Sequence, residues 1–166
     1  MDEHPIITHI PRLRRYARTL ANDRYLADDL IQDTLERAWS KYHLWRPGSD
    51  LRAWLFAIMH NVFVNQMRGR RMDLELLTDE TPTVAIRDTQ SDGLELADLR
   101  RALGSLSVEH REILLLVAVE QMKYEEIGNT LGIPVGTVMS RLSRARERLR
   151  QHLDGGANIV SLKVIK

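Results

Sequence analysis

The chain has 166 residues, a length that suits one ordinary domain or two small ones. Its formal net charge is only +1, so any nucleic-acid surface must come from a local cluster of cations. Cysteine is absent, which excludes disulfides, thiol catalysis and Cys-ligated zinc, and no apolar run is long enough for a signal peptide or a membrane span. Few aromatic residues and many Leu, Arg and Glu favour an all-α protein, which we expect to be soluble and cytoplasmic.

The first predicted helix begins near Pro11, because proline fits the first turn of a helix but breaks its interior. The arginines on its outer sides read as a solvated face, and Asn22 and Asp23 interrupt the pattern. Its apolar residues recur at helical spacing and form one stripe: Ile6, Ile10, Leu13, Ala17 and Leu20.

The second predicted helix, residues 26–42, carries a polar face opposite its apolar stripe. The apolar side collects residues at a period of 3.6: Ala27, Leu30, Ile31, Thr34, Leu35, Ala38 and Tyr42. The opposite side collects acidic and amide residues: Asp29, Gln32, Asp33 and Glu36. Such a face is often merely solvated. The functional alternative is a docking surface for a basic partner, where charge complementarity sets register and association rate.

A Pro-Gly turn signal predicts a loop over residues 43–50, and Ser49 or Asp50 can cap the helix that follows, residues 51–71. The core stripe of that helix consists of Leu51, Trp54, Leu55, Ile58 and Val62. Its other sides mix aromatic, amide and basic side chains: Phe56, Met59 and Phe63 with Arg52, His60, Asn61, Asn65, Gln66, Arg68, Arg70 and Arg71. Single-stranded nucleic acid needs this mixture, stacking platforms beside phosphate contacts. The alternative is that the aromatic rings belong to the core, which is hardest to argue for Trp45 in the loop.

Helical periodicity fades over residues 72–93, where Asp and Glu outnumber the single Arg87. This composition predicts a flexible acidic linker. It separates two predicted helical domains, residues 5–71 and 94–153. The tail, residues 154–166, begins with a pair of glycines, and the sequence does not decide its role.

The second domain opens with a helix that Gly104 closes, and its apolar stripe consists of Leu96, Leu99, Leu103 and Leu106. Ser107 then caps a further helix, residues 108–120. Its apolar run from Ile113 to Val119 predicts the centre of a small bundle.

Residues 124–153 predict two helices joined by a tight turn. Gly132 can adopt the positive φ that ends a helix, and Pro134 suits the start of the next one. One face of that next helix is apolar: Val138, Leu142, Ala145 and Leu149. Its other side is polar and basic: Thr137, Ser140, Arg141, Arg144 and Arg148. This arrangement predicts a helix-turn-helix in the major groove of DNA, and the alternative is a solvated basic face.

No catalytic constellation is visible in the sequence. It contains no Gly-rich phosphate loop and no nucleophile with a matching base, and its six histidines are scattered. We therefore expect a binding protein without enzymatic activity, cofactor or metal.

Three segments together resemble the bacterial RNA polymerase sigma factors of the extracytoplasmic-function (ECF) group: LADDLIQDTLERAW, LRAWLFAIMHNVFVNQMRGRR and LSVEHREILLLVAVEQMKYEEIGNTLGIPVGTVMSRLSRARERL. They cover most of the chain outside the linker and tail. Their joint order and spacing are far more specific than a lone helix-turn-helix. LADDLIQDTLERAW and RPGSDLRAWLF look most like the general-stress branch of the group.

The resemblance implies a role for each surface. Sigma domain two of such factors docks on the clamp helices of the largest polymerase subunit, here through Asp29, Gln32, Asp33 and Glu36. It reads the −10 element on the unpaired strand, here through Trp45, Arg46, Ser49, Asp50, His60, Asn61, Asn65, Arg68, Arg70 and Arg71. Sigma domain four reads the −35 element as duplex, here through Thr137, Ser140, Arg141, Arg144 and Arg148. An anti-sigma factor commonly holds ECF factors inactive, and we expect one that covers the acidic face and the reading helix.

Two residues depart from the family's pattern. Met139 stands where many relatives carry Lys or Arg, which predicts one missing DNA contact. Gly128 stands where a small Ala is common, which predicts a looser first helix of the helix-turn-helix.

Two other functions remain open. A regulator that binds duplex operators as a dimer would explain residues 124–153, but not the acidic face. A sigma mimic, which captures an anti-sigma factor without binding promoters, predicts loss of the arginines on the reading helix. Those arginines are present.

Overall fold

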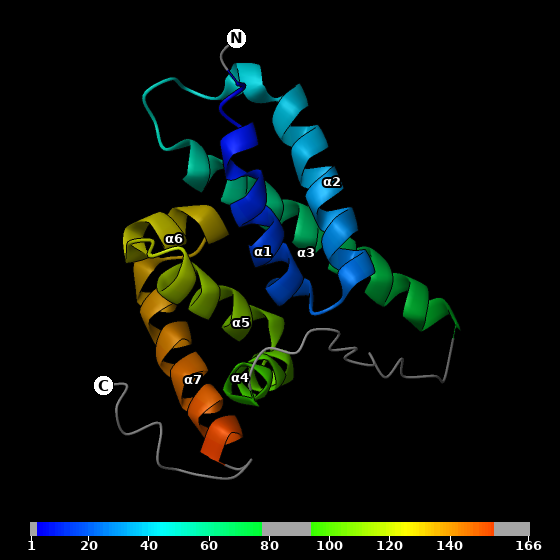
Figure 1. The fold of residues 1–166 in the computed structure, drawn as a ribbon, viewed down its shortest axis with the longest axis vertical. Helices are drawn as coiled ribbons and strands as arrows, with labels where there is room; N and C mark the ends of the chain where they lie inside the picture. Colours follow the sequence, from blue (N-terminus) through cyan, green and yellow to red (C-terminus); the bar gives the residue numbers. More distant parts are fainter. Residues whose placement is uncertain (1–2, 78–93, 155–166) are drawn as a thin grey trace. The chain divides into compact units, whose positions relative to one another are not determined.

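The structure, a computed structural model, describes residues 3–77 and 94–154. The chain divides into two compact units, Met1–Ile86 and Arg87–Lys166, and all regular structure within the described residues is helical (Figure 1). This confirms the predicted all-α class with two small bundles. Most of the predicted linker, residues 78–93, and the tail after Asp154 lie outside the described residues.

In the first unit, α2 packs against both α1 and α3 (Figure 1). The helix α1 begins at Ile10 with Pro11 in its first turn, as predicted. The helix α3 continues past Arg71 to Leu77, because the residues after Gly69 are mostly good helix formers. The described elements are η1 (Ile7–His9), α1 (Ile10–Ala21), α2 (Arg24–Ser40), η2 (Tyr42–Leu44) and α3 (Leu51–Leu77).

The two residues that interrupt the first sequence pattern form the junction between α1 and α2. Asn22 adopts a positive φ of 53°, and its N–H donates to the Arg18 carbonyl at 3.2 Å. The Asp23 carboxylate then accepts from the backbone N–H groups of Tyr25 and Leu26 at 2.8 and 3.0 Å. One residue thus ends α1 and the next caps α2.

The buried side of α3 is wider than the sequence predicts. Phe56, Met59 and Phe63 are at most 3% exposed, so the prediction that they offer stacking platforms for unpaired bases is wrong. The Phe56 ring meets Tyr16 of α1 edge-on, with centroids 4.8 Å apart, which shows that α3 contacts α1 as well as α2. A helix that contacts two neighbours needs two apolar sides. Two residues of the predicted core stripe are only half-buried: Trp54 and Ile58.

In the second unit, α7 packs against α4, α5 and α6 (Figure 1). Ser107 caps α5 as predicted, since its Oγ accepts from the His110 N–H at 3.3 Å. The described elements are α4 (Leu94–Ser105), α5 (Val108–Leu114), η3 (Leu115–Val119), α6 (Tyr124–Leu131) and α7 (Val135–Asp154).

The helix predicted over residues 108–120 changes its winding at Leu115. The Glu120 N–H donates to the Leu115 carbonyl at 3.0 Å, five residues back, which makes η3 a π-helical turn. Residues 113–116 are buried, as predicted for the bundle centre. The prediction fails at the end of the run, where Val119 is 62% exposed.

The helix α4 does not bury its predicted stripe in full. Leu96 and Leu99 are 51% and 38% exposed, whereas Ala102 and Leu106 are buried. Burial of α4 therefore concentrates at its C-terminal end.

A buried arginine holds that end of α4. Arg111 of α5 is only 6% exposed, and its Nε donates to the Leu103 carbonyl at 2.9 Å. Its Nη2 donates to the carbonyls of Gly104 and Leu106 at 3.3 and 3.1 Å. The last carbonyls of a helix have no N–H partner within the helix, so the guanidinium supplies donors there, in addition to the Leu106 N–H, which donates to the Leu103 carbonyl at 3.2 Å. Burial lowers the pKa of the Arg111 guanidinium, which nevertheless stays charged.

The turn between α6 and α7 depends on two glycines. Gly132 ends α6 with φ 69°, as predicted. A Cβ added to Gly128 would lie 2.8 Å from the Ile133 carbonyl oxygen, and the Ile133 N–H donates to the Gly128 carbonyl at 2.9 Å. Gly128 thus permits a close approach of the turn to α6, which runs without a break. That Gly128 loosens this helix stays a prediction.

We expect Gly128→Ala to lower the stability of the second unit by about 1–3 kcal/mol, the usual cost of overpacking. The clash with a backbone oxygen outweighs the gain of about 1 kcal/mol in helix propensity. Far-UV circular dichroism during guanidinium unfolding measures the change. Gly136→Ala is the matched control: nothing lies within 4 Å of its added Cβ, so it should be neutral or stabilising. Equal effects of both substitutions would contradict this explanation.

Candidate nucleic-acid interface

The polar face predicted on α2 is present and accessible. It lies opposite the buried residues of the helix, and all four members are exposed: Asp29, Gln32, Asp33 and Glu36. One member also touches α3, since the Asp33 Oδ2 accepts from Gln66 Nε2 at 2.8 Å. Asp29 and Glu36 therefore offer carboxylates at the surface, while Asp33 helps to join the two helices.

Four aromatic rings form a cluster at the C-terminal end of α2. The His4 ring packs on Trp39 and Tyr42 with centroid distances of 4.9 and 4.4 Å, and Tyr42 stacks on Trp45 at 5.6 Å. Trp45 is half-buried, and its Nε1 has no hydrogen-bond partner among the residues that the structure describes. The cluster therefore fixes the ring of the first residue predicted to contact −10 DNA. Sequence reasoning missed His4 and Trp39, because no periodic pattern links residues so far apart.

The rest of the loop contains a hydrogen bond between its own residues, and its last residue caps α3. The Ser49 Oγ donates to the Arg46 carbonyl at 2.6 Å. The Asp50 Oδ1 accepts from the Ala53 N–H at 3.3 Å, so Asp50 rather than Ser49 is the cap. All three predicted loop residues, Arg46, Ser49 and Asp50, are exposed.

The helix residues predicted for −10 contacts do not all share one side of α3. Asn61, Asn65 and Arg68 are exposed and lie on one side, since their spacings are four and three. Arg70 is exposed on the opposite side, and His60 is half-buried. Arg71 is exposed beyond them. The structure thus brings three of the six helix residues together.

The predicted reading helix α7 exposes some of its residues more than others. Ser140, Arg144 and Arg148 are exposed, whereas Thr137 and Arg141 are half-buried. The buried side consists of Val138, Leu142 and Ala145.

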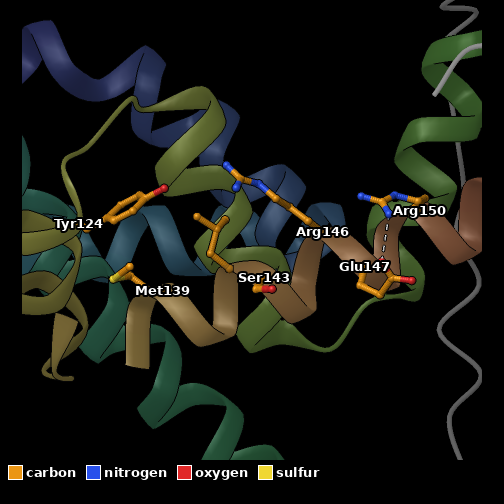
Figure 2. Close-up of a pocket in the computed structure, with 7 residues that line it drawn as sticks. Tyr124, Met139, Ser143, Arg146, Glu147 and Arg150 are labelled. Carbon is orange, nitrogen blue, oxygen red and sulfur yellow. Dashed lines mark hydrogen bonds and ion pairs between the residues drawn. The ribbon is translucent and has the colours of Figure 1, made fainter. Parts of the chain in front are cut away.

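An open recess of about 430 Å³ lies along α7 (Figure 2). At one end it includes Met139 and Tyr124, and at the other end Arg150 Nη1 pairs with Glu147 Oε2 at 3.2 Å. Sequence reasoning assigned no contact to any of these residues, although the exposed Met139 was visible as a departure from the family's pattern. The recess is lined by Tyr124, Met139, Leu142, Ser143, Arg146, Glu147 and Arg150.

Both units match known families. Residues 6–60 match the family described as the sigma2 domain of PhyR, and residues 96–149 match the family described as sigma-70, region 4. Over 145 residues the chain is 38% identical to "ECF RNA polymerase sigma factor EcfG" of Rhodopseudomonas palustris, an alignment that covers 87% of this chain and 80% of that protein. The chain belongs to the ECF RNA polymerase sigma factors.

Two solved structures share the fold. The sigma factor RpoE of Bartonella quintana, solved in complex with the anti-sigma factor NepR, has a TM-score of 0.76 and 39% identity, covering 90% of this chain and 94% of that one. CnrH, solved with the cytosolic domain of CnrY, has a TM-score of 0.65 and 31% identity, covering 92% and 86%. The similarity to EcfG supports the resemblance to the general-stress branch.

As an ECF sigma factor, the protein directs promoter-specific transcription initiation, which confirms the function predicted from its sequence. No helix in the described parts of the chain is long and apolar enough to cross a membrane.

Proposed function

We propose that this ECF sigma factor divides initiation among three surfaces. The acidic face of α2 docks on the clamp helices of core RNA polymerase, the loop with α3 reads unpaired −10 DNA, and α7 reads the −35 duplex. Residues 5–71 and 94–153 then act as sigma domains two and four, joined by residues 72–93. The protein works in the cytoplasm, where polymerase and promoter meet.

The exposure of the α2 face supports the proposal that it binds core RNA polymerase. Its four side chains point away from the buried side of the helix, and three of them, Asp29, Gln32 and Glu36, are available to a basic partner. A rigid helix also holds the carboxylates at fixed spacings, which favours a partner of matching geometry.

The −10 assignment rests on two groups of side chains. Asn61, Asn65 and Arg68 combine amides for base edges with a cation for phosphate. The clustered Trp45 offers a ring in the loop for a base taken out of the stack. Because Asn61 lies about 15 Å along α3 from the loop, the two groups would hold different nucleotides.

The −35 assignment rests on the exposed cations of α7. Arg144 and Arg148 extend from a helix that follows a tight glycine turn, as in a helix-turn-helix. Ser140 adds a short hydroxyl on the exposed surface. Together they supply phosphate contacts and base-edge donors.

Site-specific photo-crosslinking tests the three assignments together. We expect a benzophenone amino acid at Gln32 to label the largest polymerase subunit, one at Asn61 the unpaired strand, and one at Arg148 the −35 duplex. The control position is Glu109, exposed on α5, which should label none of them. Labelling of duplex from position 61, or of DNA from position 32, would overturn the assignment of that surface.

Replacing Arg141 and Arg144 together by Ala should spare polymerase binding and weaken −35 recognition by at least about tenfold, the usual cost of a lost arginine contact to a base. Competition binding of reconstituted holoenzyme to promoter and mutated-promoter fragments measures the loss. Arg101→Ala is the control, because Arg101 is an exposed arginine of the same unit that pairs with Asp98 at 3.4 Å. Equal loss of polymerase binding and promoter recognition would argue against the division of roles.

We also propose that an anti-sigma factor holds this protein inactive by covering the α2 face and α7. The supporting observation is that the similar sigma factor RpoE was solved in complex with the anti-sigma factor NepR. Pull-downs with the full chain from unstressed cells should recover a second protein that competes with core polymerase. Recovery of polymerase alone under every growth condition would contradict this proposal.

One observation favours a second function. The first unit matches a family named after PhyR, and a PhyR with 18% identity is described as an anti-anti-sigma factor. Such a mimic would bind an anti-sigma factor and no promoter. The exposed arginines of α7 favour the sigma factor, and transcription assays separate the two.

A further inference from the structure

One large apolar side chain is exposed on the polar surface of α7. Met139 is 54% exposed. Its neighbour Val138 is buried and its neighbour Ser140 is exposed. The fold does not need Met139 there, because Val138, Leu142 and Ala145 already form the buried side of the helix. An uncharged side chain at this position also gives a phosphate nothing to bind.

The surroundings leave Met139 accessible from the outside. Ser143, one turn further along α7, is short and exposed. Tyr124, at the start of α6, lies at the same end of the recess as Met139 (Figure 2). The thioether therefore lies in an open, partly apolar recess that a small group can enter.

Charge indicates what covers this surface. Arg146 and Arg150 line the same recess as Met139 and are exposed, against the single carboxylate of Glu147, so a partner that covers the recess carries negative charge. A DNA duplex fits this charge, and the feature of its major groove that rewards an apolar side chain is the 5-methyl group of thymine.

We propose that Met139 contacts the 5-methyl group of one thymine in the −35 element and thereby sets base preference at that position. This inference rests on the proposed role of α7 and deepens it. From the sequence alone, Met139 is expected to mark a missing DNA contact. We instead expect a contact here that depends on the DNA sequence, because only thymine carries the methyl group.

The test uses holoenzyme reconstituted from core polymerase and the full chain, on a promoter that it transcribes. Each thymine of the −35 element is replaced singly, on either strand, by deoxyuridine, which removes only the methyl group. At one position we expect affinity to fall about fourfold, the factor for one buried methyl group. Met139→Ala should bind the thymine and deoxyuridine promoters equally at that position.

Val135→Ala is the matched control, because Val135 is also apolar and 37% exposed on α7. It should keep the difference between thymine and deoxyuridine. Three results would overturn the proposal: no position at which deoxyuridine lowers the affinity, a −35 element that contains no thymine on either strand, or a Met139→Ala variant that still distinguishes thymine from deoxyuridine as well as the unsubstituted protein does. If replacing Arg141 and Arg144 also leaves −35 binding intact, the proposed role of α7 fails with it. If replacing Arg141 and Arg144 weakens −35 binding but no deoxyuridine substitution does, the proposed role of α7 is supported and that of Met139 is contradicted.

Discussion

Arg111→Leu should destabilise the second unit and leave the stability of the first unit unchanged. The substitution keeps a large apolar side chain but removes the donors to two carbonyls at the end of α4, Leu103 and Gly104, and to the Leu106 carbonyl just after it. Hydrogen bonds from a charged group are worth about 1.5–3 kcal/mol each. Among the described residues, the Leu103 carbonyl then keeps only the Leu106 N–H, at 3.2 Å, as a donor. We expect a loss of at least about 3 kcal/mol, a large part of the stability of a small helical bundle.

Two spectroscopic probes separate the units in this experiment. The tryptophans Trp39, Trp45 and Trp54 all lie in the first unit, so tryptophan fluorescence reports that unit alone. Far-UV circular dichroism reports the helices of both. Part of the dichroism of Arg111→Leu should be lost at a lower guanidinium concentration than in the unsubstituted protein. The fluorescence transition should stay at the same guanidinium concentration. Arg101→Leu, which removes an exposed arginine, should change neither by more than about 1 kcal/mol. A fluorescence transition that shifts equally would contradict the independence of the units.

Reversing two charges on α2, Asp29→Arg with Glu36→Arg, should weaken binding to core polymerase by at least about 100-fold. Each substitution turns a proposed attraction into repulsion, and like charges brought together at an interface cost several kcal/mol. The fold should be unaffected, because both side chains are exposed. Asp33 is left unchanged in this design, since its bond to Gln66 joins α2 to α3.

Asp28→Arg provides the control for this prediction. Asp28 is exposed on the same helix but lies outside the four-residue face. Affinity measured by fluorescence anisotropy of labelled sigma factor should fall far less for this variant than for the double reversal. Because Asp28→Arg changes the net charge by half as much as the double reversal, a loss of half the binding free energy or more would show that net charge, and not the face, governs binding.

Periodicity predicted those parts of the fold that depend on local sequence. Pro11, Ser107 and Gly132 act where the sequence places them, because capping and turn formation involve residues only a few positions apart. The polar face of α2 is also correct, since one helix with one buried side follows a simple rule.

The sequence-based predictions of burial fail where contacts between helices determine which residues are buried. Phe56, Met59 and Phe63 looked like an exposed aromatic face, but contact with both α1 and α2 buries them. Leu96 and Leu99 looked like core, but α4 buries mainly its C-terminal end. The same limit applies to the candidate site. The cluster of His4 with Trp39, Tyr42 and Trp45, and the recess beside Met139, join segments that no short-range pattern connects.

Run-off transcription shows whether this protein initiates transcription at specific promoters. Core RNA polymerase is incubated with a pool of promoter fragments, with and without this protein. We predict transcripts from a subset of fragments only when the protein is present, and that subset defines the −10 and −35 sequences together. An absence of protein-dependent transcripts, with no polymerase complex on gel filtration, would contradict the account. Duplex binding would then indicate an operator-binding regulator, and capture of an anti-sigma factor alone would indicate a mimic.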